Sequence, residues 1–299
     1  MSNKPVKSIA EQIQLLKSRG MLFRDETKAT HFLKNISYYR LKGYWWDMQE
    51  NKTSHTLLPN SYFETVIERY NFDRHLRLIL FDAIEMIEIA LRTKMIYYLS
   101  MSFGSTWYLD SSLFTNSHKH QQHLNHLQRE FGYSQEIFIK DHKRKYPNTD
   151  AAAWKILEIT SMGTLSKLYK NLEHQLPEKS TIAKEMGLNL HSELSSWLEA
   201  IVYVRNIIAH HSRLWSRTMV KRPIEHIRNP IGLWLDRDLL SVQKKKPFLI
   251  ISSMLYLCNK VASNHQIKTK ILNLISDNPD MPIYKLGFLN RWNEAPLWK

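Results

Sequence analysis

Cysteine, glycine and proline are scarce in this sequence, and long apolar runs are absent. Cys258 is the only cysteine among 299 residues, so no intrachain disulfide and no cysteine-rich metal site can form. The first residues lack the apolar core of a signal peptide, and no run of about 18 uncharged apolar residues follows. We therefore expect a soluble protein of a reducing cytoplasm that does not span a membrane.

The low count of helix-breaking residues favours an all-α fold. The chain has 8 Gly and 10 Pro, which is below the average usage of about 7% and about 5%. With 43% hydrophobic residues it can bury one large core or two smaller ones. We expect a small N-terminal helical subdomain over residues 1–55. A larger helical domain over residues 56–299 follows, with an insertion near residues 110–150 and a C-terminal helical extension.

Several segments show helical spacing. Ser8 is a suitable N-cap for a helix over residues 8–18 that Gly20 would end, and a second short helix is expected over residues 26–36. From residue 62 to about residue 100, apolar residues recur in steps of three and four, which predicts one long helix or a kinked pair. The charged residues off that stripe are expected to form a solvated, salt-bridged face.

Residues 118–145 are polar and rich in histidine, which indicates a solvent-facing helix or an inserted hairpin. Two further helical segments are expected over residues 151–172 and 180–188. Four histidines recur at short spacings and could imitate a metal site: His118, His120, His123 and His126. Because no carboxylates or cysteines lie at fitting spacings, we expect no bound metal.

The formal net charge of +14, from 42 Lys and Arg against 28 Asp and Glu, points to polyanionic partners. Nucleic acid is the first expectation and an anionic membrane surface the second. A basic surface without a special role is the remaining alternative, because net charge does not tell how the charge is distributed. Duplex DNA finds little support, since no helix-turn-helix pattern or zinc motif is visible.

Residues 192–211 have the clearest chemical pattern. Their apolar positions predict an amphipathic helix of about five turns. On such a helix Arg205 lies about 40° from Ile201, so its guanidinium sits beside the apolar stripe. Asn206 and His210 are four residues apart and share a face. Arg205 and His210 are about 140° apart on an ideal helix and could still frame one cleft.

These three side chains carry the chemistry of metal-free RNA cleavage. A histidine can move the proton of the 2′-hydroxyl or of the leaving 5′-oxygen, and an arginine can stabilise charge on the phosphorane. An amide can orient the imidazole and fix its tautomer. The alternative is a chance spacing in a basic chain with 14 His, in which the residues serve packing.

Residues 204–217, VRNIIAHHSRLWSR, resemble the signature of the Abi-like abortive-infection family, the AbiD and AbiF group. That signature is in turn similar to the HEPN ribonuclease motif, Arg-polar-x3-His. One departure is Ser216, where members commonly have Asn. Other blocks resemble the family in the same order, so the likeness covers nearly the whole chain: EQIQLLKSRG, FLKNISYYRLKGYWW, FDRHLRLILFDAIEMIEIALRTK, WKILEITSMGTLSKLY and GFLNRWNEAPLW.

The resemblance implies an HEPN-like helical bundle that acts in bacterial defence against phage. On the family motif Arg205 and His210 take the catalytic positions and Asn206 the polar one, with His211 and Arg213 in support. One motif per chain implies a homodimer with a composite active site. Such a site cleaves RNA with no cofactor or metal and leaves a 2′,3′-cyclic phosphate.

A small noncoding RNA is a further partner that the resemblance implies. The alternative function is that of a non-catalytic RNA-binding protein, which holds such an RNA and signals through oligomerisation, because HEPN-like bundles also serve as binding modules.

Basic and aromatic residues elsewhere are candidates for contact with RNA. In residues 38–46 rings alternate with cations, which suits base stacking and phosphate binding, although the rings could instead pack into the core. Further cations follow the motif and could hold the substrate backbone or serve solubility alone. The candidate RNA-binding residues are Tyr39, Arg40, Lys42, Tyr44, Arg74, Arg77, Arg217, Lys221 and Arg222.

Overall fold

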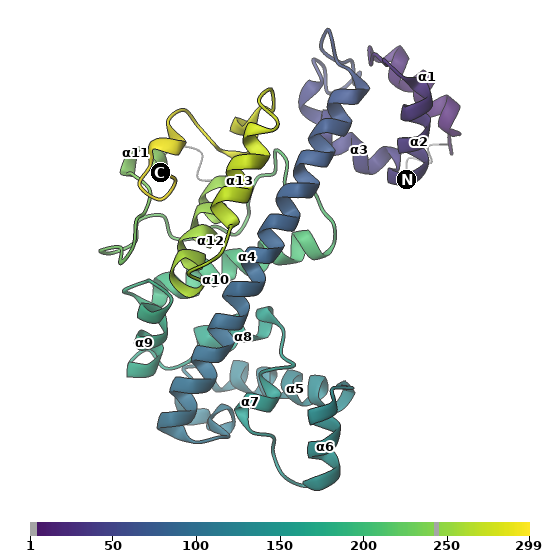
Figure 1. Ribbon diagram of the computed structural model, residues 1–299. Helices are drawn as coiled ribbons and strands as arrows, with labels where there is room; N and C mark the ends of the chain where they lie inside the picture. The colour runs from purple at the N-terminus through teal and green to yellow at the C-terminus, as the bar shows by residue number, and fades with distance from the viewer. Residues whose placement is uncertain (1–4, 242–244) are drawn as a thin grey trace. The chain divides into compact units, whose positions relative to one another are not determined.

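The computed structural model describes residues 5–241 and 245–299, and within these ranges the fold is all-α (Figure 1). The only β pairings in the described residues are isolated bridges. The predicted fold class is therefore confirmed. The chain divides into two compact units, of which the first comprises Met1–Leu78, Arg213–Trp215 and Asn273–Met281. The second comprises Ile79–Ser212, Ser216–Leu272 and Pro282–Lys299.

The first unit contains α1 (Ile9–Ser18), α2 (Glu26–Ile36) and α3 (Tyr38–Trp45), followed by the 3-10 helix η1 (Trp46–Met48). Ser8 caps α1, because its hydroxyl accepts a hydrogen bond from the backbone of Glu11 while the Glu11 carboxylate accepts one from Ser8. The two helices predicted over residues 8–18 and 26–36 are confirmed.

α4 (Phe63–Phe103) is one continuous helix of 41 residues that begins in the first unit and continues into the second. The long helix predicted from residue 62 is thus confirmed. Its charged residues form the expected ion pairs, with Arg92 at 2.7 Å from Glu88 and Asp82 at 2.6 Å from Lys270 of α13 (Ile267–Ser276). The expected solvation is wrong for Arg92 and Glu88, whose side chains are only 12% and 21% exposed. No helix in the described part of the chain, α4 included, is long and apolar enough to cross a lipid bilayer.

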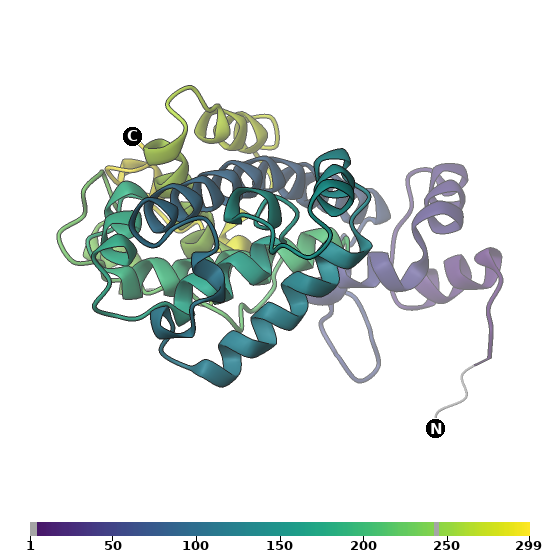
Figure 2. The ribbon, with the colours of Figure 1, turned by 90° about the horizontal axis from the view of Figure 1, so that it is seen from below.

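The second unit is built around α10 (His191–Ala209), whose buried side chains include Trp197, Leu198 and Ile201. The other helices of this unit are α5 (Ser117–Tyr133), α6 (Ile137–Lys145), α7 (Ala153–Ile156), α8 (Met162–Asn171), α9 (Pro177–Glu185), α11 (Arg237–Ser241) and α12 (Pro247–Val261). α10 packs against α8, α9 and α12, and α8 also contacts α5 (Figures 1 and 2).

α13 (Ile267–Ser276) begins in the second unit and ends in the first. Short 3-10 helices complete the second unit: η2 (Trp107–Leu109), η3 (Ser111–Leu113), η4 (Ile283–Leu286) and η5 (Trp292–Glu294).

The histidine-rich segment forms a helical hairpin of α5 and α6, as expected for residues 118–145. His118 is exposed and fits the solvated prediction. That prediction is wrong for His120, which is buried, stacks on Phe114 at 4.0 Å between ring centroids, and bonds through Nε2 to the carbonyl oxygen of Tyr108. The hairpin thus contributes to the core of the second unit because one face of α5 packs inward.

Candidate active site

The Arg205–His210 segment lies at the C-terminal end of α10. The helix ends at Ala209, and His210 is its C-cap, with its backbone N–H donating to the carbonyl oxygen of Asn206 at 3.1 Å. Val204, Ile207 and Ile208 are buried and hold this last turn against the core. The side chains of Asn206 and His210 are both exposed, as their four-residue spacing on one face predicts.

A Schellman turn follows His210 and fixes the direction in which the chain leaves α10. The N–H of His211 donates to the carbonyl oxygen of Ile208 and that of Ser212 to Ile207, both at 2.8 Å. His211 takes the left-handed position of this turn with a φ of 53°. Glycine usually occupies that position, because a left-handed backbone costs other residues roughly 1–2 kcal/mol. The second histidine is therefore held in a strained conformation directly after the candidate catalytic one.

Arg205 is half-buried and lines a small groove between α10 and α4. The groove has a volume of about 250 Å³ and also contains Phe81, Ile84, Glu85, Glu88, Ile89 and Arg92. Asn206 and His210 are not among its lining residues. One chain thus presents Arg205 to this groove and His210 to solvent on another face of α10.

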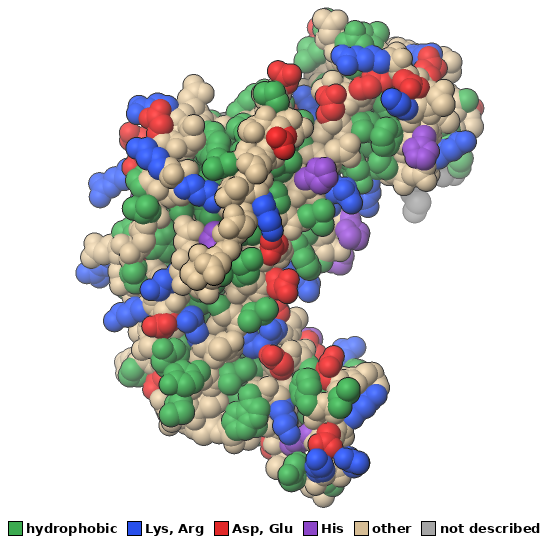
Figure 3. Space-filling view, viewed as in Figure 1, with side chains coloured by type: hydrophobic (Ala, Val, Ile, Leu, Met, Phe, Trp, Pro, Cys, Tyr) green, Lys and Arg blue, Asp and Glu red, His purple; other side chains and the backbone are tan. Residues whose placement is uncertain are grey.

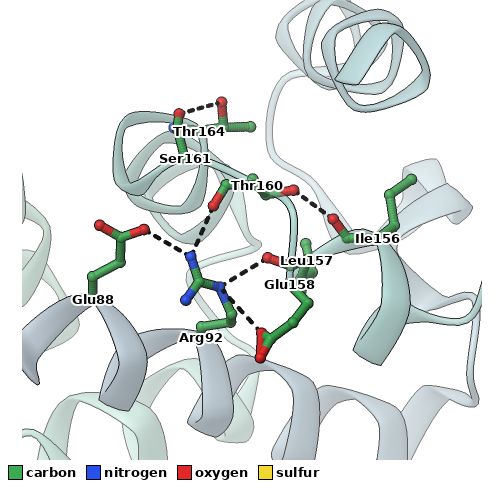
Figure 4. A network of polar contacts seen from close by, with 8 residues as sticks. All are labelled: Glu88, Arg92, Ile156, Leu157, Glu158, Thr160, Ser161 and Thr164. Carbon is green, nitrogen blue, oxygen red and sulfur yellow. Dashed lines mark hydrogen bonds and ion pairs between the residues drawn. The ribbon is translucent and has the colours of Figure 1, made fainter. Parts of the chain in front are cut away.

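The wall of this groove is held by a polar network around Arg92 (Figure 4). Its Nη2 donates to Glu88 at 2.7 Å and to the carbonyl oxygen of Thr160 at 2.9 Å, and its Nε donates to the carbonyl oxygen of Leu157 at 2.9 Å. Glu158 lies 3.5 Å from the same Nε. These bonds connect the loop before α8 to α4, and they hold the Glu88 side chain in place in the groove.

Arg213 and the two residues after it belong to the first unit. There the buried carboxylate of Asp73 accepts the backbone N–H of Trp215 at 2.7 Å and of Leu214 at 3.1 Å, as well as the Tyr44 hydroxyl at 2.7 Å. Burial raises the pKa of Asp73, although Tyr44 and these N–H groups act in the opposite direction. Asp73 therefore organises the segment Arg213–Trp215 within this unit.

Gly43 explains how Arg213 fits against α3. A Cβ at Gly43 would lie 2.8 Å from Nε of Arg213, which is too close for a stable contact. Glycine inside a helix costs roughly 1 kcal/mol relative to alanine. We infer that it is present here because the half-buried Arg213 side chain crosses the helix at this point.

The candidate RNA-binding residues of the first unit separate into two groups. Tyr39 is 78% exposed, and Arg40 and Arg74 are also exposed. Lys42 lies over the ring of Trp46 at 5.4 Å. By contrast, two residues are buried in the network of Asp73 and have structural partners there: Tyr44 and Arg77, the latter in an ion pair at 3.3 Å.

The remaining candidates lie in the loop that follows the motif, in the second unit. This loop is tied to α10, because the N–H of Ile224 donates to Ser196 at 3.0 Å and the indole of Trp197 donates to the carbonyl oxygen of Ile224 at 2.8 Å. Lys221 pairs with Glu199 of α10. Arg222 is exposed and Arg217 is half-buried.

Ser216 has a left-handed φ of 52°. Asparagine tolerates that region better than serine does, because its side chain can bond to the local backbone. This geometry gives a physical reason for the Asn that Abi-like sequences commonly have at the position.

Glu85, Glu88 and Arg92 line the same groove as Arg205, and no motif in the sequence marks them as site residues. The only signal was the charge pattern on the long helix, which equally describes a solvated face. A groove between two helices that are distant in sequence requires the fold to be known. Within residues 5–241 and 245–299, no cluster of three or more His, Cys, Asp or Glu side chains is arranged to hold a metal ion.

Comparison with known proteins gives one result. Residues 31–216 match the family model described as Abi-like protein. The matched region covers more than half of the chain and contains the whole Arg205–His210 segment. Neither curated proteins nor solved structures gave a match. The family name associates the chain with abortive infection. This chain is a member of the Abi-like protein family.

Proposed function

We propose that this protein is a metal-independent endoribonuclease of the HEPN type that binds and cleaves RNA during abortive infection in the bacterial cytoplasm. The observation that carries the proposal is the exposed pair of Asn206 and His210 on one face of a firmly packed helix end. Arg205 precedes them on the same turn and provides a permanent cation. An imidazole, an amide and a guanidinium are thus concentrated in the last turn of α10 and its cap.

In this mechanism His210 removes the proton from a ribose 2′-hydroxyl, and the 2′-oxygen attacks the adjacent phosphorus. The bond from phosphorus to the 5′-oxygen breaks, and the leaving oxygen takes up a proton from an imidazolium. The products are a 2′,3′-cyclic phosphate and a free 5′-hydroxyl. Arg205 stabilises the added charge on the phosphorane, and Asn206 orients the imidazole.

A homodimer completes the site in this proposal. Proton removal and proton donation need two groups, and the chain carries one motif. In the second unit two apolar side chains of α4 are exposed about 80° apart around the helix, with Phe81 45% and Ile89 51% exposed. Both line the groove of Arg205. A second copy packed on these two side chains would bury them and approach Arg205.

The dimer is tested by mass measurement in solution. Ile89→Glu places a charge in this apolar contact beside Phe81, so the variant is expected to be monomeric and to lose cleavage. Glu68→Gln, an exposed change elsewhere on α4, serves as the control and keeps the dimer. A wild-type monomer that still cleaves RNA would contradict the dimeric site.

The second candidate is a non-catalytic protein that holds a small noncoding RNA. One observation favours it: Arg205 shares its groove with the carboxylates of Glu85 and Glu88, an arrangement suited to packing. In that case RNA copurifies with the chain as one defined sequence, no RNA is cut, and Arg205→Ala lowers stability.

The deciding experiment uses wild-type protein and labelled RNA in excess EDTA. The proposal predicts cleavage with 2′,3′-cyclic phosphate ends. The same RNA with a single 2′-deoxynucleotide at the mapped cut site should stay intact there, because the attacking hydroxyl is missing. Wild-type protein that is inert in EDTA, or that cuts the 2′-deoxy substrate equally well, would refute this chemistry.

A further inference from the structure

A second and larger hollow lies in the second unit between α5, α8 and α10. Its volume is about 770 Å³. Basic side chains from three segments converge on it: Lys119, Lys167, Lys170, His123, His126 and His174. None of these residues belongs to the Arg205–His210 segment, and none was a candidate for RNA contact from sequence.

The hollow is positively charged in spite of one carboxylate. Glu199 lies in it but accepts hydrogen bonds from Lys170, at 2.8 Å, and from Lys221, and these bonds lower its pKa to about 2. Among the described residues Lys119 and Lys167 have no ion-pair partner and are exposed. Their charge is therefore available to an anion.

His123 supplies a half-buried imidazole to the hollow. Its pKa falls to about 4, first because it is half-buried and then because Lys167, His120, His126 and Lys119 lie nearby. The imidazole is neutral near pH 7, and its buried Nδ1 has no hydrogen-bond partner. A neutral imidazole can donate one hydrogen bond and accept another. A polar group without a partner in a cationic hollow is suited to meet a ligand.

Hydroxyl and amide side chains also line the hollow, and such groups commonly contact phosphate and sugar. They are Thr115, Asn116, Gln122, Thr164, Ser166 and Asn171. Thr115 and Asn171 already donate hydrogen bonds to carbonyl oxygens of the chain, so the lysines are the groups that favour phosphate. Figure 3 shows Lys and Arg interspersed with Asp and Glu on the face viewed, so net charge alone does not locate a binding surface.

One face of α10 connects this hollow with the candidate active site. Glu199 and Val202 line the hollow, and Asn206 and His210 follow at steps of four residues. Positions four apart lie above one another on a helix, so these residues form one stripe. From Val202 to His210 the rise is about 12 Å at 1.5 Å per residue.

At its other end the stripe meets a smaller hollow of about 330 Å³. Glu199 is shared by the two hollows, and Ser196, Lys221 and Arg222 line the smaller one. Cations thus extend along α10 on both sides of Glu199.

We propose that the hollow between α5, α8 and α10 binds the phosphodiester backbone of single-stranded RNA and leads it along α10 to His210. Lys119 and Lys167 contact phosphates, and His123 bonds to a phosphate or ribose oxygen. The inference rests on the proposed function for its direction toward His210, but binding itself requires no cleavage. The hollow would be the surface that holds the RNA substrate cleaved at His210.

The test is salt-dependent binding of a fluorescent 20-nucleotide single-stranded RNA to the full chain, at 4 °C in EDTA. Each phosphate contact on a single strand contributes about 0.7 to the slope of log K against log salt. Lys119→Gln with Lys167→Gln should therefore lower the slope by about 1.4 and weaken binding roughly 20-fold near 0.1 M salt. The matched control, Lys184→Gln with Lys260→Gln, removes two exposed lysines elsewhere in the second unit and should bind like wild type.

Thermal unfolding verifies that each variant is folded, and Lys167→Gln alone replaces the double variant if that one is not. Equal affinity and slope for the double variant and its control would overturn the proposal. So would equal competition by polyglutamate of the same length, which would indicate a site for acidic peptides. If wild type does not cut RNA but the double variant loses RNA binding, the proposed binding site is supported and the proposed nuclease activity is wrong. If wild type and the double variant cut RNA and bind it equally well, the proposed binding site is wrong and the proposed nuclease activity is supported.

Discussion

The backbone N–H of His210 donates to the carbonyl oxygen of Asn206 at 3.1 Å, and this bond ties the candidate base to the residue that would orient it. Both side chains are exposed, while the neighbouring Ile207 and Ile208 are buried. The apolar side of the helix end is therefore packed against the core, and its polar side faces solvent. Changes at Asn206 or His210 should alter chemistry with little effect on folding, whereas changes at buried partners should do the reverse.

A substitution at Arg205 distinguishes the nuclease from the non-catalytic RNA-binding protein. Arg205→Lys keeps the charge but loses the planar donor array that fits a phosphorane. We expect cleavage to fall roughly 100-fold while the melting temperature changes by no more than about 2 °C. Single-turnover cleavage and thermal unfolding, measured side by side, check this. A large drop in melting temperature with an unchanged rate would instead favour a packing role beside Glu85 and Glu88.

Glycine at position 211 should give a more stable chain than alanine does. Its left-handed φ of 53° is strained for any residue with a Cβ. His211→Gly and His211→Ala both remove the imidazole, so their difference isolates the backbone effect. We expect the glycine variant to unfold with about 1 kcal/mol more free energy than the alanine variant in urea titrations. A less stable glycine variant would mean that the turn is not left-handed.

Asp73→Ala should destabilise the first unit strongly. The change leaves the N–H groups of Leu214 and Trp215 and the hydroxyl of Tyr44 without an acceptor. Each unsatisfied buried donor costs about 1–3 kcal/mol, so we expect a loss of at least about 3 kcal/mol in urea unfolding. Asp73→Asn keeps one accepting oxygen and should lose less. The exposed Asp280→Ala serves as control, and an Asp73→Ala variant as stable as this control would refute the role of the carboxylate.

Lys179 gives a pH-dependent prediction. It is fully buried, and burial lowers its pKa to about 8. An unfolded lysine titrates near 10.4. Between about pH 8 and about pH 10.4 the unfolded chain therefore binds more protons, and the free energy of unfolding gains a contribution from Lys179 that rises with pH.

The measurement compares urea unfolding at pH 8 and pH 10 for wild type and Lys179→Met. The methionine variant has no ammonium to titrate, so its stability should rise less, or fall more, over this interval than that of wild type. An identical pH dependence for the two proteins would show that burial does not lower the pKa of Lys179.

The sequence was sufficient to predict local structure where pattern and propensity agree. Ser8 as N-cap of α1 and the apolar stripe of α10 are such cases, because capping and helical periodicity act within a few residues. The half-buried position of Arg205 also follows from its angle to Ile201 on the helix.

Other features depend on the fold and were not predictable. Glu85 and Glu88 line one groove with Arg205 only because α4 lies beside α10 in the second unit. Lys119 and Lys167 come together from α5 and α8, and each looks like an ordinary solvated lysine in the sequence. Burial of Tyr44 likewise depends on Asp73, a partner on another helix.

The most direct measurement is the single-turnover rate of RNA cleavage in EDTA by wild type, His210→Ala and the matched His31→Ala, which removes an exposed histidine of α2. Loss of a general acid or base lowers rates about 10²- to 10⁴-fold. Cleavage should therefore drop by at least about 100-fold in His210→Ala and remain at the wild-type rate in His31→Ala. Cleavage by His210→Ala at the wild-type rate would contradict the assignment of this histidine as the catalytic residue.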